Sequence, residues 1–222
     1  MFKDYKTYNK KYLLGDIHGY WGVIAQHIMH YLEKNIAYIQ VGDFGIGFNS
    51  VEKEGERLKE LNKILDEYEC DLYVIRGNHD NPAKCKVHPN WIRDGHYDDS
   101  LRMMFLGGGY SVDRHLRVEG RDWWPDEEMR LSEYYELLIK YEEEKPRVMV
   151  THDCPEIEEL MLPLIGANSL ITTRTGQVFR SMWHAHQPDI WVFGHYHKSL
   201  DMFIGNTRFI CVDQMQFKDL DI

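Results

Sequence analysis

The feature that most constrains the fold of this chain is a series of short apolar runs, each leading into a turn that carries a polar side chain. The runs cover residues 12–14, 36–41, 72–75, 148–150 and 190–193. Short apolar runs bounded by turn residues are typical of buried β-strands. The polar residues that follow them are Asp16, His18, Asp43, Asn78, His152, His195 and His197. Because ligands bind beyond the carboxyl ends of strands in open α/β sheets, we expect these side chains to share one rim.

Helical patterns separate several of the predicted strands. Apolar residues recur at helical spacing over residues 20–34 and 51–69, and an acidic amphipathic helix is predicted over residues 131–144. Further strands are predicted at residues 101–106 and 207–212. Strands and helices that alternate at intervals of about 30 residues are typical of βαβ units. The chain is therefore predicted to have an α/β fold.

We expect a single domain over residues 1–222, because the chain contains no internal repeat, low-complexity tract or linker. The four cysteines are Cys70, Cys85, Cys154 and Cys211. They form no Cys-x-x-Cys pair, so we predict free thiols in a reducing compartment. Residues 1–11 lack the apolar stretch of a signal peptide, and no apolar run approaches the roughly 20 residues that span a bilayer. These features predict a cytoplasmic protein without a membrane partner.

The formal charge of −10 argues against long duplex nucleic acid as a partner. Proteins that bind a duplex through its phosphates usually present a basic face, and the sequence contains no run of lysine and arginine. Bound divalent cations would reverse the sign of one local patch only.

Two pairs of polar residues are spaced so that both members can reach one ligand. Asp16 and His18 stand two residues apart, as do His195 and His197. In an extended segment, residues i and i+2 point the same way, so each pair can offer two ligands to one metal ion. Either pair alone is weak evidence, because Asp-x-His can form a simple turn and Asp16 could merely begin the next helix.

The ordered set of motifs is far more specific than either pair. The motifs are Gly15-Asp16-Ile17-His18-Gly19, Gly42-Asp43, Gly77-Asn78-His79-Asp80, Thr151-His152-Asp153 and Gly194-His195-Tyr196-His197. Together they resemble the calcineurin-like metallophosphoesterase superfamily, in particular its bacterial and phage-type members. The resemblance spans residues 15–197. It implies two packed mixed β-sheets flanked by helices, a four-layer αββα sandwich with metal ions at one edge.

The resemblance also implies a role for each candidate ligand. Asp16, His18 and His197 would bind one divalent metal ion, Asn78, His152 and His195 would bind a second, and Asp43 would bridge the two. Two cations held about 3.5–4 Å apart require a bridging anion, and a hydroxide shared between them is a strong nucleophile for a phosphate ester. Mixed nitrogen and oxygen ligands suit manganese, our first choice, and also iron, zinc, nickel or cobalt.

His79 follows the ligand Asn78 directly, and the resemblance implies that it protonates or hydrogen-bonds the leaving oxygen. A histidine with a pKa near neutrality suits that task. Asp80 is a weaker candidate, since it could orient His79 or cap the next segment.

One motif departs from the superfamily pattern. Protein-phosphatase members continue the second motif as Gly-Asp-x-x-Asp-Arg-Gly, but Ile46 and Gly47 occupy the places of the second aspartate and the arginine. The acid that would pair with His79 and the arginine that would hold the phosphate are therefore missing there, unless another residue such as Arg76 reaches in. The departure weakens a phosphoserine or phosphothreonine phosphatase assignment.

The segment 107–125 is a candidate rim for the substrate. The glycines at positions 107, 108 and 109 permit close backbone approach, and Tyr110, Arg114 and Trp124 could hold a phosphate or stack on a base. The alternative is a glycine turn with a tryptophan pair packed on the edge of a sheet.

We therefore predict a metal-dependent hydrolase of phosphate mono- or diesters that acts on a small phosphorylated substrate or nucleotide. Two alternatives stay open: a catalytically weak scaffold of the same fold that binds proteins, and a small nuclease or cyclic-phosphate phosphodiesterase. The oligomeric state is not predicted.

Overall fold

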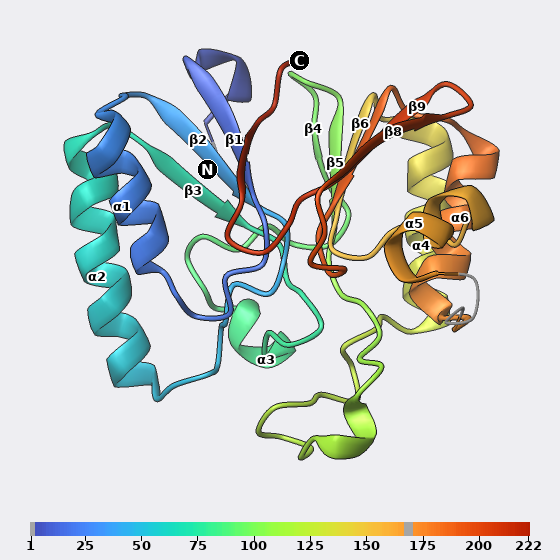
Figure 1. Ribbon diagram of the computed structural model, residues 1–222, viewed down its shortest axis with the longest axis horizontal. Helices are drawn as coiled ribbons and strands as arrows, with labels where there is room; N and C mark the ends of the chain where they lie inside the picture. The colour runs from blue at the N-terminus through green and yellow to red at the C-terminus, as the bar shows by residue number, and fades with distance from the viewer. Residues whose placement is uncertain (1–2, 167–170) are drawn as a thin grey trace.

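Two β-sheets pack face to face, and helices cover both outer faces (Figure 1). The computed structural model of the protein describes residues 3–166 and 171–222, so six residues of the predicted domain lie outside the described part of the chain. The predicted α/β architecture of two mixed sheets flanked by helices is confirmed.

The first sheet has four strands in the described part of the chain. They are β1 (Lys10–Leu14), β2 (Ile36–Gln40), β3 (Asp71–Val74) and β10 (Phe217–Asp219). Their order across the sheet is β10-β1-β2-β3, with β1, β2 and β3 parallel and β10 antiparallel to β1. The carboxyl ends of the three parallel strands therefore lie at the same edge.

The second sheet has six strands among the described residues. They are β4 (His96–Asp98), β5 (Met103–Leu106), β6 (Val148–Thr151), β7 (Ile190–Phe193), β8 (Leu200–Ile204) and β9 (Thr207–Cys211). Their order is β4-β5-β6-β7-β9-β8. The four central strands are parallel, and the edge strands β4 and β8 each pair antiparallel with a neighbour.

Helices close the sandwich on both sides, at the left and right of Figure 1. The helices are α1 (Gly22–Tyr31) and α2 (Val51–Glu67) on the first sheet, and α4 (Leu131–Glu144), α5 (Glu158–Ile165) and α6 (Arg174–Ala185) on the second. The short α3 (Pro82–Cys85) follows the turn after β3. No helix in the described ranges is both long and apolar enough to cross a membrane.

A cluster of buried side chains lies between the sheets and explains the continuous apolar runs. Leu13 and Ile39 from the first sheet, and Phe105, Val150 and Val192 from the second, belong to this cluster and are fully buried. Burying such a side chain contributes about 1.5–3 kcal/mol relative to leaving it exposed. Strands covered on both faces have no solvent-facing side, so their sequences do not alternate between apolar and polar residues.

The sequence patterns located the interior strands but missed three edge strands. The missed strands β4, β8 and β10 each pair antiparallel at the margin of a sheet. An edge strand is only partly covered, and in β8 the side chain of Phe203 is 69% exposed. These strands therefore lack the continuous apolar run that marks the interior ones.

The buried His88 predicts a loss of stability in mild acid. Its ring packs against Trp21 and Phe44, and its Nε2 atom has no hydrogen-bond partner among the described residues. Burial lowers the pKa of His88 to about 4 from the ordinary 6.5. As the pH falls, His88 therefore binds a proton in the unfolded chain before it does so in the folded protein. The part of the unfolding free energy that depends on neutral His88 is complete above pH 6.5 and is lost as the pH falls towards 4.

We expect His88 to account for about 2 kcal/mol of the fall in unfolding free energy between pH 7.5 and pH 5. Urea unfolding of the wild type and of His88→Phe at both pH values measures this difference, with His30→Gln on the exposed face of α1 as the control. An equal fall in the wild type and in His88→Phe would contradict the prediction.

Candidate metal centre and active site

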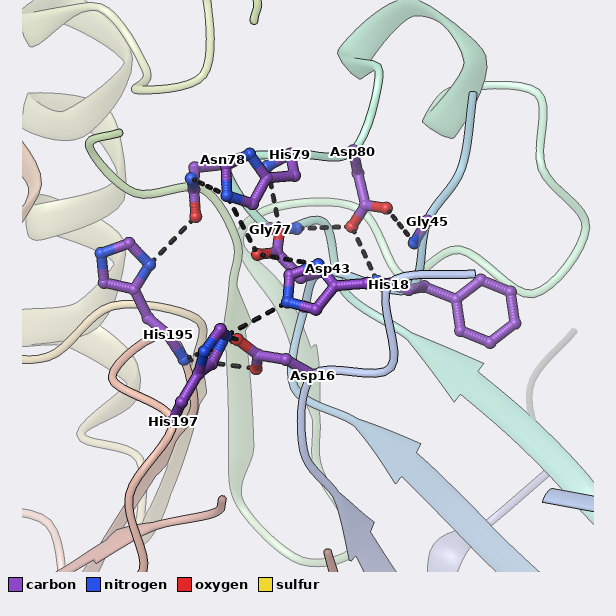
Figure 2. Close-up of polar contacts among 12 residues, drawn as sticks. Asp16, His18, Asp43, Gly45, Gly77, Asn78, His79, Asp80, His195 and His197 are labelled. Atoms are coloured by element: carbon purple, nitrogen blue, oxygen red, sulfur yellow. Dashed lines mark hydrogen bonds and ion pairs between the residues drawn. The ribbon is translucent and has the colours of Figure 1, made fainter. Parts of the chain in front are cut away.

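The candidate ligands converge where the parallel strands of both sheets end. They lie on the loops that follow β1, β2, β3, β6 and β7, and Figure 2 shows most of them pointing toward one centre. Asp16, Asp43, Asn78 and His152 are buried, and His195 and His18 are partly buried. The sequence pattern predicted that these strand ends share one rim, and the resemblance implied that two packed sheets supply them.

Asp16, His18 and His197 form the first group of candidate ligands. The His197 Nε2 atom lies 3.0 Å from Asp16 Oδ2. The His18 Nε2 atom lies 3.1 Å from His197 Nε2. One carboxylate oxygen and two imidazole nitrogens are therefore close enough to bind a single metal ion.

Asn78, His152 and His195 form the second group. The Asn78 Oδ1 atom lies 2.9 Å from His152 Nε2 and 3.0 Å from His195 Nδ1. The Nδ1 atom of His152 lies 2.8 Å from the carbonyl oxygen of Val41. Because a carbonyl only accepts, that contact places the proton on Nδ1 and directs the lone pair of a neutral His152 Nε2 toward Asn78.

Asp43 lies between the two groups. Its Oδ2 atom is 3.6 Å from His152 Nε2 and 3.9 Å from His18 Nδ1, so one carboxylate faces a ring from each group. Burial raises the pKa of Asp43, but the charges of His152, His79 and His18 outweigh burial and hold the pKa well below its ordinary value. Asp43 is therefore an anion, as a bridge between two cations requires.

The chemistry of the donor set fits divalent metal ions. At Asn78 an amide oxygen faces two ring nitrogens, and at His18 and His197 two Nε2 atoms face each other. A neutral imidazole nitrogen that lacks a proton is an acceptor, so these groups bring lone pairs together. Such convergence is unfavourable unless a proton or a cation lies between the atoms. Two triads, Asp16-His18-His197 and Asp16-Asp43-His152, have ligand atoms close enough for an ion.

The backbone at four candidate ligands lies in the left-handed region. The φ angles are 43° at His18, 55° at Asp43, 68° at His195 and 49° at His197. Residues other than glycine seldom adopt such angles, each at a cost of about 1–3 kcal/mol, and they cluster at functional sites. The surrounding fold therefore holds these loops in a conformation that their own preferences disfavour.

The glycines of the motifs leave room for the carboxylates. A Cβ atom at Gly77 would overlap the Oδ1 atom of Asp43, and one at Gly194 would overlap the Oδ1 atom of Asp16. A larger residue at either position would push a candidate ligand out of place. This close approach is the physical reason for glycine immediately before Asn78 and His195.

The His79 ring faces the centre through Nε2, but its Nδ1 atom is not paired with a carboxylate among the described residues. Its Nε2 atom is 3.9 Å from Asp43 Oδ2 and 3.3 Å from a terminal nitrogen of Arg117. Its Nδ1 atom is buried and has no hydrogen-bond partner within the described ranges. Burial lowers the pKa of His79, and the charge of Arg117 adds to this effect while Asp43 opposes it.

Asp80 holds two loops together. Its carboxylate accepts hydrogen bonds from the backbone N–H groups of Gly45 (2.7 Å), Ile46 (2.8 Å), Gly77 (2.8 Å) and Phe44 (3.2 Å). These contacts tie the loop that carries Asp43 to the loop that carries Asn78 and His79 (Figure 2). Asp80 is therefore placed to fix the spacing of candidate ligands from β2 and β3.

Arg76 is placed away from the centre. Its side chain is buried, with Nε 2.9 Å from Asp94 Oδ2 and a terminal nitrogen 2.8 Å from the Glu127 carbonyl oxygen. It lines a cavity of about 920 Å³ that carries charges of both signs and is lined by none of the candidate ligands. The contacts of Arg76 are those of a structural residue.

The other three candidate substrate residues lie in the segment 107–125. Trp124 is largely buried, and its Nε1 atom donates to the carbonyl oxygen of His79 at 3.2 Å. The guanidinium of Arg114 lies 4.6 Å from the ring centre of Tyr110. Trp124 thus stabilises the loop that carries His79 through its backbone. Tyr110 and Arg114 form a stacked cation–π pair in the same segment.

Sequence patterns missed a support for Asn78 formed by Ser111 and Glu127. The Asn78 Nδ2 atom donates to Ser111 Oγ at 2.8 Å, and that hydroxyl donates to the Glu127 carboxylate. This chain turns the amide so that its oxygen faces His152 and His195. Ser111 lies 33 residues from Asn78. It belongs to the segment 107–125 that the sequence marked as a candidate substrate rim, but nothing in that segment indicated a contact with Asn78.

We expect Ser111→Ala to weaken metal binding at the Asn78 group by about 10- to 100-fold, the range typical when a partner of a metal ligand is removed. Competition with a fluorescent chelator for Mn²⁺ measures the affinity. Ser181→Ala on α6 is the matched control, because its hydroxyl donates to the carbonyl oxygen of Gln177, within its own helix and away from the candidate ligands. Unchanged affinity in Ser111→Ala would show that the hydroxyl does not orient Asn78.

Comparisons with known proteins point to one family. A family model for calcineurin-like phosphoesterases matches residues 10–199. A proposed 5′-nucleotidase from Staphylococcus aureus, solved with α-ketoglutarate, has a similar fold with a TM-score of 0.52 and 13% sequence identity, over 92% of this chain and 48% of that one. This chain thus spans about half the length of that protein.

A second solved structure, of an archaeal phosphodiesterase, is 11% identical with a TM-score of 0.40, over 95% of this chain and 98% of its own. No curated protein matches this chain in sequence.

Proposed function

Because this chain belongs to the calcineurin-like phosphoesterase family, we propose that it hydrolyses phosphate esters at a centre of two divalent metal ions. The observation that carries the proposal is the convergence of carboxylate, amide and imidazole lone pairs on both sides of Asp43. Such ions, when bound, supply an activated water as nucleophile and offset the negative charge of the phosphate oxygens.

The ligands divide into two groups around a shared carboxylate. In our proposal Asp16, His18 and His197 hold one ion, Asn78, His152 and His195 hold the other, and Asp43 contacts both. The neutral amide of Asn78 limits the total negative charge of the centre. The mixed donor set suits manganese, our first choice, and equally iron, zinc, nickel or cobalt.

His79 is the proposed proton donor to the leaving oxygen. Its Nε2 atom faces Asp43 from outside the two ligand groups, so a substrate held at the centre would present its ester oxygen to this ring. Asp80 keeps the loops of Asp43 and His79 at a constant separation through its four backbone contacts. We assign His79 the catalytic role and Asp80 a positioning role.

The proposed substrates are small phosphorylated molecules or nucleotides, handled by one domain over residues 1–222. A scaffold without catalysis fits less well, because the chain keeps every ligand of the family pattern together with His79. We propose that the protein works in a reducing cytoplasm, where its four free, buried cysteines would stay as thiols.

Hydrolysis of para-nitrophenyl phosphate and of bis-para-nitrophenyl phosphate tests the proposal. The protein is assayed after chelation and again after addition of Mn²⁺, Ni²⁺, Co²⁺, Zn²⁺ or Mg²⁺. We expect no release from the chelated protein and restored release with at least one ion. Folded protein that binds metal but releases nothing from these esters or from a panel of nucleotides would overturn the proposal and favour the scaffold.

A further inference from the structure

An arginine that no motif marked lies against the catalytic histidine. Arg117 follows η2 (Arg114–Leu116), in the yellow-green segment that projects beyond the ends of the sheets in Figure 1. One of its terminal nitrogens lies 3.3 Å from His79 Nε2, the ring atom that faces Asp43. The side chain is 26% exposed, so its guanidinium is within reach of a molecule from solvent.

The guanidinium of Arg117 is held in a defined orientation. Its Nε atom and a terminal nitrogen each donate to the Asp113 carboxylate at 2.7 Å, and the other terminal nitrogen lies 3.4 Å from the carbonyl oxygen of Asp122. Both oxygens of Asp113 are engaged by this one arginine. The N–H groups of the guanidinium are thus preorganised, and the nitrogen beside His79 is directed toward the centre.

The contact between Arg117 and His79 is a weak one that a substrate could replace. A guanidinium only donates, so the contact needs a neutral His79 with its lone pair on Nε2. A phosphate oxygen carries a formal negative charge and forms shorter, stronger bonds to a guanidinium than a neutral imidazole does. A phosphate placed between Asp43 and Arg117 would therefore take over this nitrogen. His79 Nε2, which also lies 3.2 Å from Asn78 Nδ2, would then be released from the arginine and could take up the proton that it donates to the ester oxygen.

Neither position 47 nor Arg76 supplies this charge to the centre. Gly47 stands where protein-phosphatase members of the family carry an arginine. The buried Arg76 is engaged by Asp94 and by the Glu127 carbonyl oxygen. Arg117 comes from a different part of the chain, but it occupies the side of His79 where a phosphate-binding cation is needed.

We infer that Arg117 binds the terminal phosphate of a monoester and makes the enzyme selective for monoesters over diesters, an inference that rests on the proposed function. A monoester has three non-ester oxygens, so two can face the metal ions while the third meets Arg117. A diester has only two, and its second ester group would meet the guanidinium instead. Loss of Arg117 should therefore harm monoester hydrolysis far more than diester hydrolysis.

The test compares both para-nitrophenyl esters in the wild type, Arg117→Met, Arg117→Lys and Arg121→Met, all loaded with Mn²⁺. We expect Arg117→Met to lower kcat/KM for the monoester by about 10- to 100-fold, as for loss of a hydrogen bond to a charged group. The diester should lose less than about 5-fold, because no such bond is removed. Arg117→Lys keeps the positive charge but loses the planar set of N–H donors, so we expect an intermediate fall in kcat/KM for the monoester.

Arg121→Met is the matched control, because Arg121 is exposed and, among the described residues, its side chain pairs with its neighbour Asp122 alone. It should leave both esters unchanged. Equal losses for both esters in Arg117→Met, or no loss in either, would overturn the inference. Metal content and thermal unfolding are measured alongside, so that a structural effect of the substitution is seen directly.

Calorimetric titration with inorganic phosphate separates this inference from the proposed function. We expect the Kd of Mn²⁺-loaded protein for phosphate to rise about tenfold in Arg117→Met and to stay constant in Arg121→Met. If the wild type hydrolyses neither of these esters nor any nucleotide of the panel, the proposed function fails and the titration alone decides the role of Arg117. An unchanged Kd would then refute the phosphate contact.

Discussion

Asp43→Asn should lower kcat for para-nitrophenyl phosphate by about 1000-fold or more, which corresponds to about 4 kcal/mol of lost transition-state stabilisation. Asp43 is the buried anion that faces His152 from one ligand group and His18 from the other. The amide keeps the shape but not the charge that two cations need between them. We expect bound Mn²⁺ to fall from near two equivalents to one or fewer.

The matched control for this variant is Asp201→Asn, on the exposed strand β8. Asp201 pairs with Arg208 and Lys218 rather than with any candidate ligand, so its loss should cost less than about 1 kcal/mol and leave kcat unchanged. Metal content and turnover are measured on the same samples. Retention of both metal equivalents and more than a tenth of the activity by Asp43→Asn would exclude a bridging role.

His79→Ala should show an effect that depends on the leaving group. Proton transfer to a leaving oxygen is worth about 100- to 10,000-fold when that oxygen is a strong base. We therefore expect kcat to fall by at least about 100-fold for a nucleoside monophosphate, whose leaving oxygen is an alkoxide. The fall for para-nitrophenyl phosphate should be under about 10-fold, because nitrophenolate leaves without a proton.

His184→Ala, on the exposed face of α6, is the control and should leave both rates unchanged. Metal content should stay the same in His79→Ala, since His79 lies in neither group of candidate ligands. A fall of equal size for both substrates would mean that His79 acts through the structure of its loop rather than by proton transfer.

The sequence alone was sufficient to predict the interior strands, the αββα layering and the set of candidate ligands. The strands and the candidate ligands are encoded locally, because an interior strand needs a continuous apolar run and a ligand follows directly at its end. The αββα layering was implied by the resemblance that the ordered motifs carry. Helix α4 also begins and ends at the predicted residues, since its amphipathic pattern is complete within one segment. The order of the motifs along the chain was then enough to predict that Asp16, Asn78 and His195 lie at one rim.

Only the tertiary structure decided how the centre is supported and what surrounds it. The pairs Asn78–Ser111 and His79–Arg117 are separated by 33 and 38 residues, and the segment that supplies their second members has no periodic pattern. Arg76 follows a predicted strand, yet its partner Asp94 holds it away from the centre. Such contacts depend on where two loops meet in space, and that position is set by the packing of both sheets rather than by either loop.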